Sequence, residues 1–384
     1  GGVRKYFMKH TVVLIPCESY ESEQVCEKLK KGLELLGGLE LLINKKEKVL
    51  LKLNLVRGAS PERAVTTHPA VAAALARIFQ EKGYPHVSAG DSSGFGSPVK
   101  IMEELGLKPV FKKYGVEIKE FKEAVPVDFP QGVHAKRFML ARDVLDAEAL
   151  VSVCKMKTHA LEHITGAVKN QYGCVQGFHK AKGHTLYSDP VSFARMLGDL
   201  NRLVKPRLYI MEGITAMEGN GPTSGDPVPM HLLLLSTDPV ALDSVFCHLV
   251  HLDPQLVPTN VQGEQMGLGT WRPENIELLT EEGPMELSRA LERYGNPDFR
   301  VKRSREKARG WMGAVGIFKI FRRKPRIRGE LCRKCGVCVE SCPVEGKALH
   351  FSNGRDKPPV YDYKKCIRCF CCQEMCPHRA IFVK

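Results

Sequence analysis

Two runs of cysteines near the C-terminus have the spacing that binds iron–sulfur clusters. The segment "CIRCFCCQEMCP" contains a C-x2-C-x2-C-x3-C pattern followed by a proline, in Cys366, Cys369, Cys372, Cys376 and Pro377. The segment "CRKCGVCVESCP" repeats the pattern in Cys332, Cys335, Cys338, Cys342 and Pro343. In such paired runs the first three thiolates bind one cubane and the fourth binds the other. The repeat therefore predicts two [4Fe–4S] clusters.

This crossing of the fourth cysteine decides which thiolates share a cluster. The predicted ligands of cluster one are Cys332, Cys335, Cys338 and Cys376. Those of cluster two are Cys366, Cys369, Cys372 and Cys342. Aligning the runs sets Cys371 opposite Val337, so we expect Cys371 to be a small buried apolar side chain rather than a ligand. A pair of zinc sites also uses C-x2-C pairs, but the duplicated pattern with its trailing proline disfavours it.

A second candidate site lies in the basic segment "KMKTHALEHITGAVKNQYGCVQGFHKAKGH" (155–184), which has one acidic residue, Glu162. Its cationic and histidine residues are Lys155, Lys157, Lys169, Lys180, Lys182, His159, His163, His179 and His184. Interspersed glycines let the backbone approach a ligand, and lysines suit a carboxylate or phosphate. A Lys or His here is also a candidate proton donor, although no spacing selects one. The alternatives are a solvated basic face and a metal site built from the histidines.

Further polar residues follow the predicted strands of the N-terminal part. They are Lys52, Asn54, Asp91, Ser92, Ser93, Lys155, Lys157, His159, Glu212, Glu218, Asn220, Asp238 and Asp243. Ligands of open α/β sheets bind outside the carboxyl ends of the strands. We therefore expect one crevice to collect these side chains.

The elements that would position them alternate between strands and helices. Apolar strands are predicted at 48–55, 148–159 and 207–222, a helix at 66–84, and a strand followed by a helix within 231–252. This alternation predicts an α/β fold, a mostly parallel sheet with helices on both faces. The tail is expected to form a small α+β ferredoxin-like domain. The predicted parts are an α/β domain at 1–299, a basic linker at 300–330 and a two-cluster domain at 331–384.

The net charge of +14 is concentrated in the C-terminal part. Residues 300–328 contain 12 Lys/Arg and one acid, whereas residues 1–299 are almost neutral. No nucleic-acid recognition motif accompanies the charge, so we expect an acidic redox partner protein and no nucleic acid. P-loop and dinucleotide-binding glycine motifs are absent, which argues against those nucleotide sites.

No apolar run of about 20 residues is present, so no transmembrane segment is expected. The linker stretch "WMGAVGIFKIFRR" (311–323) either packs the small domain onto the large one or lies on an anionic membrane surface. The cysteines outside the two ligand sets are scattered along the sequence and do not have the paired spacing of a disulfide framework. That usage predicts a reducing, cytoplasmic location.

Several stretches resemble a known family. "KLN", "TTHP", "GDSSG", "CKMKTH", "TGAVKNQYG", "EGNGPTSGDP" and "STDPVALD" are similar to the domain of unknown function 362 family, over roughly residues 46–265. The resemblance implies an α/β body fused to a bacterial-type ferredoxin domain, typical of anaerobic bacteria and archaea, and it brings no substrate. It draws attention to Lys52, Asn54, His68, Asp91, Lys155, Lys157, His159, Lys169, Asn170, Asn220 and Asp243.

Together these features predict an iron–sulfur oxidoreductase that passes low-potential electrons to an anionic small molecule in the α/β domain. The catalytic candidates are Lys155, Lys157, His159 and Lys169. The candidates for binding a substrate or cofactor are Lys52, Asn54, Asp91, Asn170, Asn220 and Asp243. The alternative is a non-catalytic electron-transfer or scaffolding subunit that docks to a partner enzyme. No motif indicates a further cofactor, such as a flavin or a non-iron metal.

Overall fold

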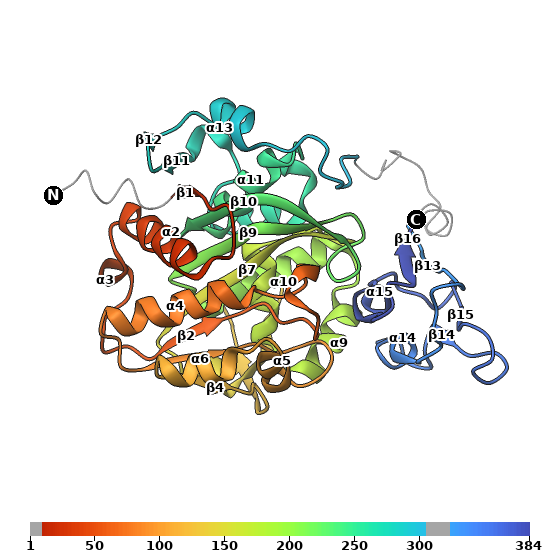
Figure 1. Cartoon of the computed structure of the whole chain (residues 1–384). Coiled ribbons are helices and arrows are strands. Elements are labelled where there is room, and N and C mark those ends of the chain that lie inside the picture. The colour runs from red at the N-terminus through yellow and green to blue at the C-terminus, as the bar shows by residue number, and fades with distance from the viewer. Residues whose placement is uncertain (1–9, 305–322) are drawn as a thin grey trace.

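A computed structural model describes residues 10–304 and 323–384 of the chain. Its centre is a ten-stranded sheet in the order β12-β11-β1-β10-β9-β7-β2-β3-β4, with β8 paired to β7 (Figure 1). In that order the strands are β12 (Gly283–Pro284), β11 (Glu277–Thr280), β1 (Thr11–Pro16), β10 (Asp226–Ser236), β9 (Leu208–Glu218), β7 (Ala149–His159), β2 (Val49–Lys52), β3 (Val87–Gly90), β4 (Val116–Lys119) and β8 (His163–Thr165). The predicted α/β class is confirmed.

Parallel pairing runs continuously through β4, β3, β2, β7 and β9. The carboxyl ends of these strands therefore meet at one edge of the sheet, where Lys52, Asp91 and Lys157 lie. Asp238, which was expected in the same crevice, follows the antiparallel strand β10 and lies at the opposite edge, because the end of β10 pairs with the start of β9. Antiparallel pairing enters with the hairpin of β9 and β10 and continues from β10 to β1. β7 continues well past β2, since Lys52 at the end of β2 pairs with Ser152 near the start of β7.

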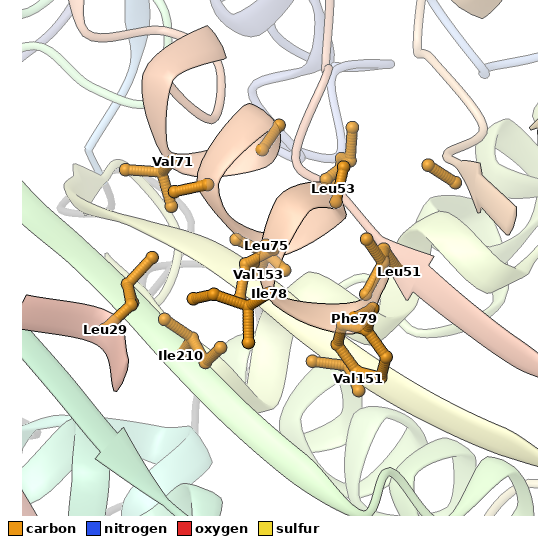
Figure 2. Close-up of a cluster of buried hydrophobic side chains, with 14 of the residues drawn as sticks. Leu29, Leu51, Leu53, Val71, Leu75, Ile78, Phe79, Val151, Val153 and Ile210 are labelled. Atoms are coloured by element: carbon orange, nitrogen blue, oxygen red, sulfur yellow. The ribbon is translucent and has the colours of Figure 1, made fainter. Parts of the chain in front are cut away.

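Helices cover both faces of the sheet. On one face α2 (Ser22–Leu35), α4 (Pro69–Glu81) and α6 (Leu107–Lys113) pack on the strands. Figure 2 shows Leu75, Ile78 and Phe79 of α4 lying over Val151 and Val153 of β7. The other face is covered by α10 (Pro190–Val204) and α11 (Pro239–Leu249). Each fully buried Leu, Ile or Phe stabilises the fold by about 1.5–3 kcal/mol relative to an exposed one.

Two of the predicted helices begin at side chains that cap their first turn. α4 has His68 as its N-cap, with the ring Nδ1 accepting from the amide of Ala70 at 3.1 Å, and Pro69 in its first turn. α11 has Asp238 as its N-cap, accepting from Val240 and Ala241 at 2.8 and 2.9 Å. Proline in the first turn loses no hydrogen bond there, which is why both helices start at this point.

The remaining elements of the body are shorter. The helices are α3 (Leu39–Leu42), α5 (Pro98–Glu104), α7 (Arg142–Leu145), α8 (Ala167–Asn170), α9 (Gly177–Leu186), α12 (Pro258–Gln265), α13 (Leu287–Tyr294) and the 3₁₀ turns η1 (Pro61–Arg63), η2 (Gln171–Cys174), η3 (Pro254–Leu256) and η4 (Pro273–Asn275). A separate hairpin is formed by β5 (Ala124–Asp128) and β6 (Arg137–Ala141).

The tail forms a small domain beside the body, with α15 nearest to it in Figure 1. Its elements are β13 (Pro325–Ile327), α14 (Val337–Glu340), β14 (Leu349–His350), β15 (Val360–Tyr361), α15 (Cys371–Met375) and β16 (Ile381–Val383). β13 pairs with β16 and β14 with β15, both antiparallel. None of the helices in the described ranges is long and apolar enough to cross a membrane. The stretch at 311–323, expected either to pack the two domains together or to lie on a membrane surface, is outside the described residues except for Arg323.

Candidate functional site

The tail docks on the body mainly through α15. The backbone carbonyl of Glu374 accepts a hydrogen bond from Thr223 Oγ1 at 2.6 Å. Asn220, predicted to bind a substrate or cofactor, lies in this contact instead of at the cavity described next. Its Nδ2 donates to the carbonyl of Ile381 at 2.8 Å, and its Oδ1 accepts from Gln373 at 3.1 Å. Asn220 therefore joins the two domains.

A cavity of about 160 Å³ lies between the body and the tail. Six of the predicted site residues line it: Lys52, Asn54, Asp91, Lys157, Lys169 and Asn170. The tail contributes Ser341, Cys371, Glu374 and Met375 to the same wall. The structure thus places one crevice at the carboxyl ends of β2, β3 and β7, and the small domain closes its outer side.

Lys52 and Asp91 form a buried ion pair at the base of the cavity, with 2.7 Å between Nζ and Oδ1. Asp91 also accepts from the backbone amides of Leu55 and Ser92, at 2.7 and 2.8 Å. A Cβ at Gly173 would lie 2.0 Å from Asp91 Oδ1, so only glycine lets η2 pack against the pair. The two charges therefore compensate each other within a fixed arrangement.

Lys157 is equally buried but has no carboxylate partner in the described part of the chain. Its Nζ donates to Asn54 Oδ1 at 2.7 Å and to the carbonyl of Val65 at 2.8 Å. Burial, reinforced by the positive charges of Lys169 and Lys155, lowers the pKa of Lys157 to about 7. At neutral pH this side chain is a mixture of amine and ammonium, which suits either anion binding or proton transfer.

Three basic side chains line the cavity from the segment 169–184, namely Lys169, Lys180 and His184. Lys169 is half-buried, and its ammonium makes no hydrogen bond or ion pair with another described residue. Lys180 donates to the carbonyl of Ser92, and burial lowers its pKa to about 8. His184 stacks on Phe193 with ring centroids 4.8 Å apart, and burial lowers its pKa to about 4. The His184 imidazole is therefore neutral, and its Nδ1 lacks a partner among the described residues.

His159 ends β7 behind the cavity wall. Its Nδ1 accepts from the amides of Leu161 and Glu162, both at 3.1 Å. The ring proton is therefore on Nε2, which donates to Glu374 Oε1 at 2.7 Å. Burial lowers the pKa of His159 to about 4. Burial also raises the pKa of Glu374, but the Lys169 charge and the His159 hydrogen bond outweigh it, so the carboxylate stays ionised.

The alternative of a metal site built from these histidines is not observed in the described part of the chain. No group of three or more His, Cys, Asp and Glu side chains is arranged there to hold a single ion. Instead, His159 bonds Glu374, His163 Nδ1 contacts the carbonyl of Lys302 at 3.0 Å, and His184 stacks on Phe193.

Lys155 lies two residues before Lys157 on β7, yet it does not line the cavity. Its Nζ lies 2.5 Å from Glu212 Oε2, and both side chains are fully buried. Tyr20 completes this cluster: its hydroxyl donates to Glu212, accepts from Lys155 at 3.1 Å, and its ring stacks on His68. The pairing of β7 with β9 shifts register between Lys155 and Lys157, which gives the two lysines different neighbours.

Asp243 also lies away from the cavity. Its carboxylate accepts from the amides of Ala167 and Val168, at 2.6 and 3.1 Å, at the start of α8. A Cβ at Gly166 would lie 2.2 Å from Asp243 Oδ1, so the close approach requires glycine. Burial raises the pKa of Asp243 to about 7 despite these bonds. Asp243 therefore positions α8, which carries Lys169 and Asn170.

The predicted cluster-one ligands line one small cavity in the tail, which fits a shared cubane. They are Cys332, Cys335, Cys338 and Cys376, and Ile327 and Ile381 are among the apolar neighbours. The backbone amide of Ala380 donates to Cys376 Sγ at 3.4 Å. Amide hydrogen bonds to sulfur stabilise thiolates that ligate a cluster.

The predicted cluster-two ligands also lie close to one another. Burial raises the pKa of Cys366, and the neighbouring thiolates of Cys369 and Cys342 raise it further. Cys372 Sγ lies 3.3 Å from the Tyr361 hydroxyl, and the amide of Ala348 donates to Cys342 Sγ at 3.4 Å. Crowded thiolates that disfavour one another's charge are suited to cationic iron.

Some cavity residues were not among the sequence-derived site candidates. Cys371, expected to be a buried apolar side chain, is buried but also lines the cavity. Glu374, Met375 and Tyr172 line it too. Glu374 lies inside the cysteine run, where the cluster spacing dominates the pattern, and the glycine-flanked "NQYG" around Tyr172 was the only signal for that residue.

Comparisons with known proteins agree with this division of the chain. Residues 49–248 match the domain of unknown function DUF362, and residues 324–377 match a 4Fe-4S dicluster domain. A thylakoid-associated protein of Synechocystis sp. is 36% identical over 263 residues, which cover 68% of this chain and 81% of that protein.

Two further similarities are more limited. One component of the H2:CoB-CoM heterodisulfide, ferredoxin reductase of Methanothermobacter marburgensis is 36% identical over 84 residues, 18% of this chain and 13% of that protein. The lactate racemase apoprotein of Thermoanaerobacterium thermosaccharolyticum aligns with a TM-score of 0.42 at 10% identity, over 64% of this chain and 58% of that one. The family match over the body and the identity to the Synechocystis protein show that this chain belongs to the domain of unknown function 362 family, with a 4Fe-4S cluster-binding domain at its C-terminal end.

Proposed function

We propose that this protein is an iron–sulfur oxidoreductase that passes electrons from two [4Fe–4S] clusters to an anionic substrate or cofactor in the interdomain cavity. One observation carries the proposal. Cys371 directly precedes the cluster-two ligand Cys372, and it lines the same cavity as Lys157 and Lys169. Ser341, directly before the ligand Cys342, lines that cavity as well. A molecule bound there would lie next to the loops that hold cluster two.

Exposure gives the two clusters an order. Each cluster has two buried ligands, but one ligand of cluster one, Cys335, is exposed, whereas no ligand of cluster two is. When bound, the clusters supply electrons at a low potential, on the order of −400 mV. We therefore propose that an external carrier meets cluster one and that cluster two serves the cavity.

The carrier we propose is an acidic redox protein. Arg333 and Lys334 separate two cluster-one ligands, and Arg333 is exposed. Opposite charge on a partner would speed the encounter and make its rate fall with salt. The scattered thiols and the oxygen-sensitive clusters favour a reducing compartment such as the cytoplasm.

A second candidate is a non-catalytic electron-transfer or scaffolding subunit. It is favoured by the similarity of the tail to one component of a larger reductase. In that case the isolated chain would accept electrons but bind no small molecule. A copurifying flavin or non-iron metal would instead support chemistry inside this chain.

The test of the cluster assignment is a matched pair of cysteine variants, purified without oxygen. Wild type should contain about eight irons and equal acid-labile sulfide, from two four-iron clusters. Cys372→Ser should lose cluster-two iron, whereas Cys371→Ser, one residue earlier, should keep the wild-type content. Electron paramagnetic resonance of the dithionite-reduced protein reports whether two interacting clusters are present. Equal iron loss in both variants, or about four irons in wild type, would contradict the assignment.

A further inference from the structure

We infer that the ligand of the interdomain cavity is a small anion with at least two negative charges, such as a short di- or tricarboxylate or a compact phosphate compound, held directly by Lys157, Lys169 and Lys180. The inference rests on the proposed function, since it specifies the substrate class of that site. Anion binding can nevertheless be measured without any electron transfer.

The charges on the cavity wall do not cancel. Four lysines line the cavity, namely Lys52, Lys157, Lys169 and Lys180, against two acids, Asp91 and Glu374. Lys52 and Asp91 neutralise each other at 2.7 Å. Glu374 accepts a hydrogen bond from Nε2 of His159. Three lysines therefore face one carboxylate, which leaves room for an anion of about two charges.

The hydrogen bonds of these lysines show which of them are available. Lys157 and Lys180 donate only to neutral oxygens, the Asn54 amide and two backbone carbonyls. Lys169 has no hydrogen bond or ion pair within the described residues. Enclosing an ammonium without a paired carboxylate is unfavourable, so an anionic ligand would supply the missing counter-charge.

The three lysines come from separate elements. Lys157 lies on β7, Lys169 on α8 and Lys180 on α9. They would therefore meet a ligand from different directions, which suits an anion whose charges are separated. His184 adds a neutral polar group: it is 6% exposed, and its Nδ1 has no partner among the described residues. Met375 and Tyr172 give the same wall an apolar part.

The size of the cavity limits the ligand. At roughly 10–15 Å³ for each enclosed water, a volume of about 160 Å³ holds on the order of ten to fifteen non-hydrogen atoms. A flavin nucleotide or a dinucleotide is much larger. We therefore expect the cavity to bind a small metabolite-sized anion and to reject such cofactors.

The experiment is calorimetric titration of the oxidised, cluster-loaded full chain without oxygen, at pH 6.5 and low salt. Succinate and citrate test carboxylates, pyrophosphate tests phosphates, and acetate and flavin mononucleotide test charge and size. We expect at least one multivalent anion to bind at least tenfold more tightly than acetate, and flavin mononucleotide not to bind. Comparison of the affinities for citrate and pyrophosphate shows whether the site prefers carboxylates or phosphates.

Variants then locate the binding. Lys169→Gln should weaken binding of the preferred anion about tenfold or more, because it removes a charged hydrogen bond. Lys169→Arg should restore much of the affinity. Lys182→Gln, an exposed lysine on α9 outside the cavity wall, should leave the affinity unchanged. Circular dichroism and iron content confirm that each variant is folded and loaded.

Two results would overturn the inference: no binding of any multivalent probe, or equal loss of affinity in the Lys169→Gln and Lys182→Gln variants. Each leaves the proposed function separately testable. Clusters that load and reduce normally without anion binding reject the ligand class alone. Anion binding by a chain that holds no cluster-two iron rejects the electron-transfer role alone.

Discussion

Lys155 and Lys157 lie two residues apart on β7 and are both fully buried, but their surroundings differ in charge. Lys155 is paired with the Glu212 carboxylate at 2.5 Å and closed off by Tyr20. Lys157 donates only to neutral oxygens and lines the interdomain cavity. The comparison teaches that a buried lysine with an internal counter-charge has its charge balanced by the protein, whereas one without is available to a ligand.

The largest effect is expected from Lys155→Met. It would leave Glu212 buried without its counter-charge, so the free energy of unfolding should fall by about 3–5 kcal/mol. Urea denaturation followed by circular dichroism measures this. The control is Lys155→Met with Glu212→Gln, which removes both charges and should recover most of the loss. A cost below about 1 kcal/mol for the single variant would show that the ion pair is not structural.

The opposite pattern is expected for Lys157→Met, with a small loss of stability and a large loss of anion affinity. Unpairing Asn54 Oδ1 and the Val65 carbonyl costs stability, but removing a buried amine offsets part of it, so we expect a net loss of about 1 kcal/mol. Affinity for the preferred multivalent anion should fall about tenfold or more. Calorimetric titration measures the anion affinity of Lys157→Met and of Lys155→Met under conditions where both variants are folded. If Lys155→Met weakened binding more, the assignment of the two lysines would be inverted.

Local spacing accounts for those predicted residues of the tail and of the strand ends that the structure brings together. Ligand grouping follows from the intervals between cysteines, and Cys332 and Cys376 do line one cavity. Lys52, Asp91 and Lys157 meet because the carboxyl ends of parallel strands share one edge.

The differences between neighbouring polar residues could not be predicted, because distant partners decide them. Lys155 depends on Glu212 in β9 and on Tyr20 near the N-terminal end of the described chain. Asn220 follows the end of β9 and joins the domains, whereas Asp243 lies within α11 and positions α8. Polar residues after strands therefore predicted that side chains gather at one edge of the sheet, but they did not predict the role of each side chain.

The pH dependence of stability offers a smaller, independent test of Lys157. Its pKa is about 7 in the folded protein against an ordinary value of 10.5, set by burial and by the charges of Lys169, Lys155, Glu374 and Asp91 around it. Between these values the unfolded chain binds a proton that the folded chain does not. The contribution of Lys157 to stability should therefore rise with pH from about 7 to 10, by at most about 1.4 kcal/mol per pH unit.

The measurement is the free energy of unfolding of wild type and Lys157→Met at pH 7, 8 and 9. The wild-type values should rise more steeply, because other titrating groups are common to both proteins. Anion affinity of the wild type should decline over the same range, since the ligand binds the ammonium form. Parallel stability profiles would show that Lys157 keeps its ordinary pKa and that the cavity does not shield it from water.

The smallest effect is expected at Lys180, which lies half-buried where α9 borders the cavity. The Lys180 ammonium already donates to the Ser92 carbonyl, whereas that of Lys169 makes no hydrogen bond within the described residues, so Lys180→Ala should weaken anion binding only about two- to fivefold. Lys182→Ala, on the same helix but exposed and outside the wall, is the matched control and should have no effect. If Lys180→Ala instead cost more affinity than Lys169→Gln, the anion would bind at the rim rather than beside the loops of cluster two, and the link between the two sites would be lost.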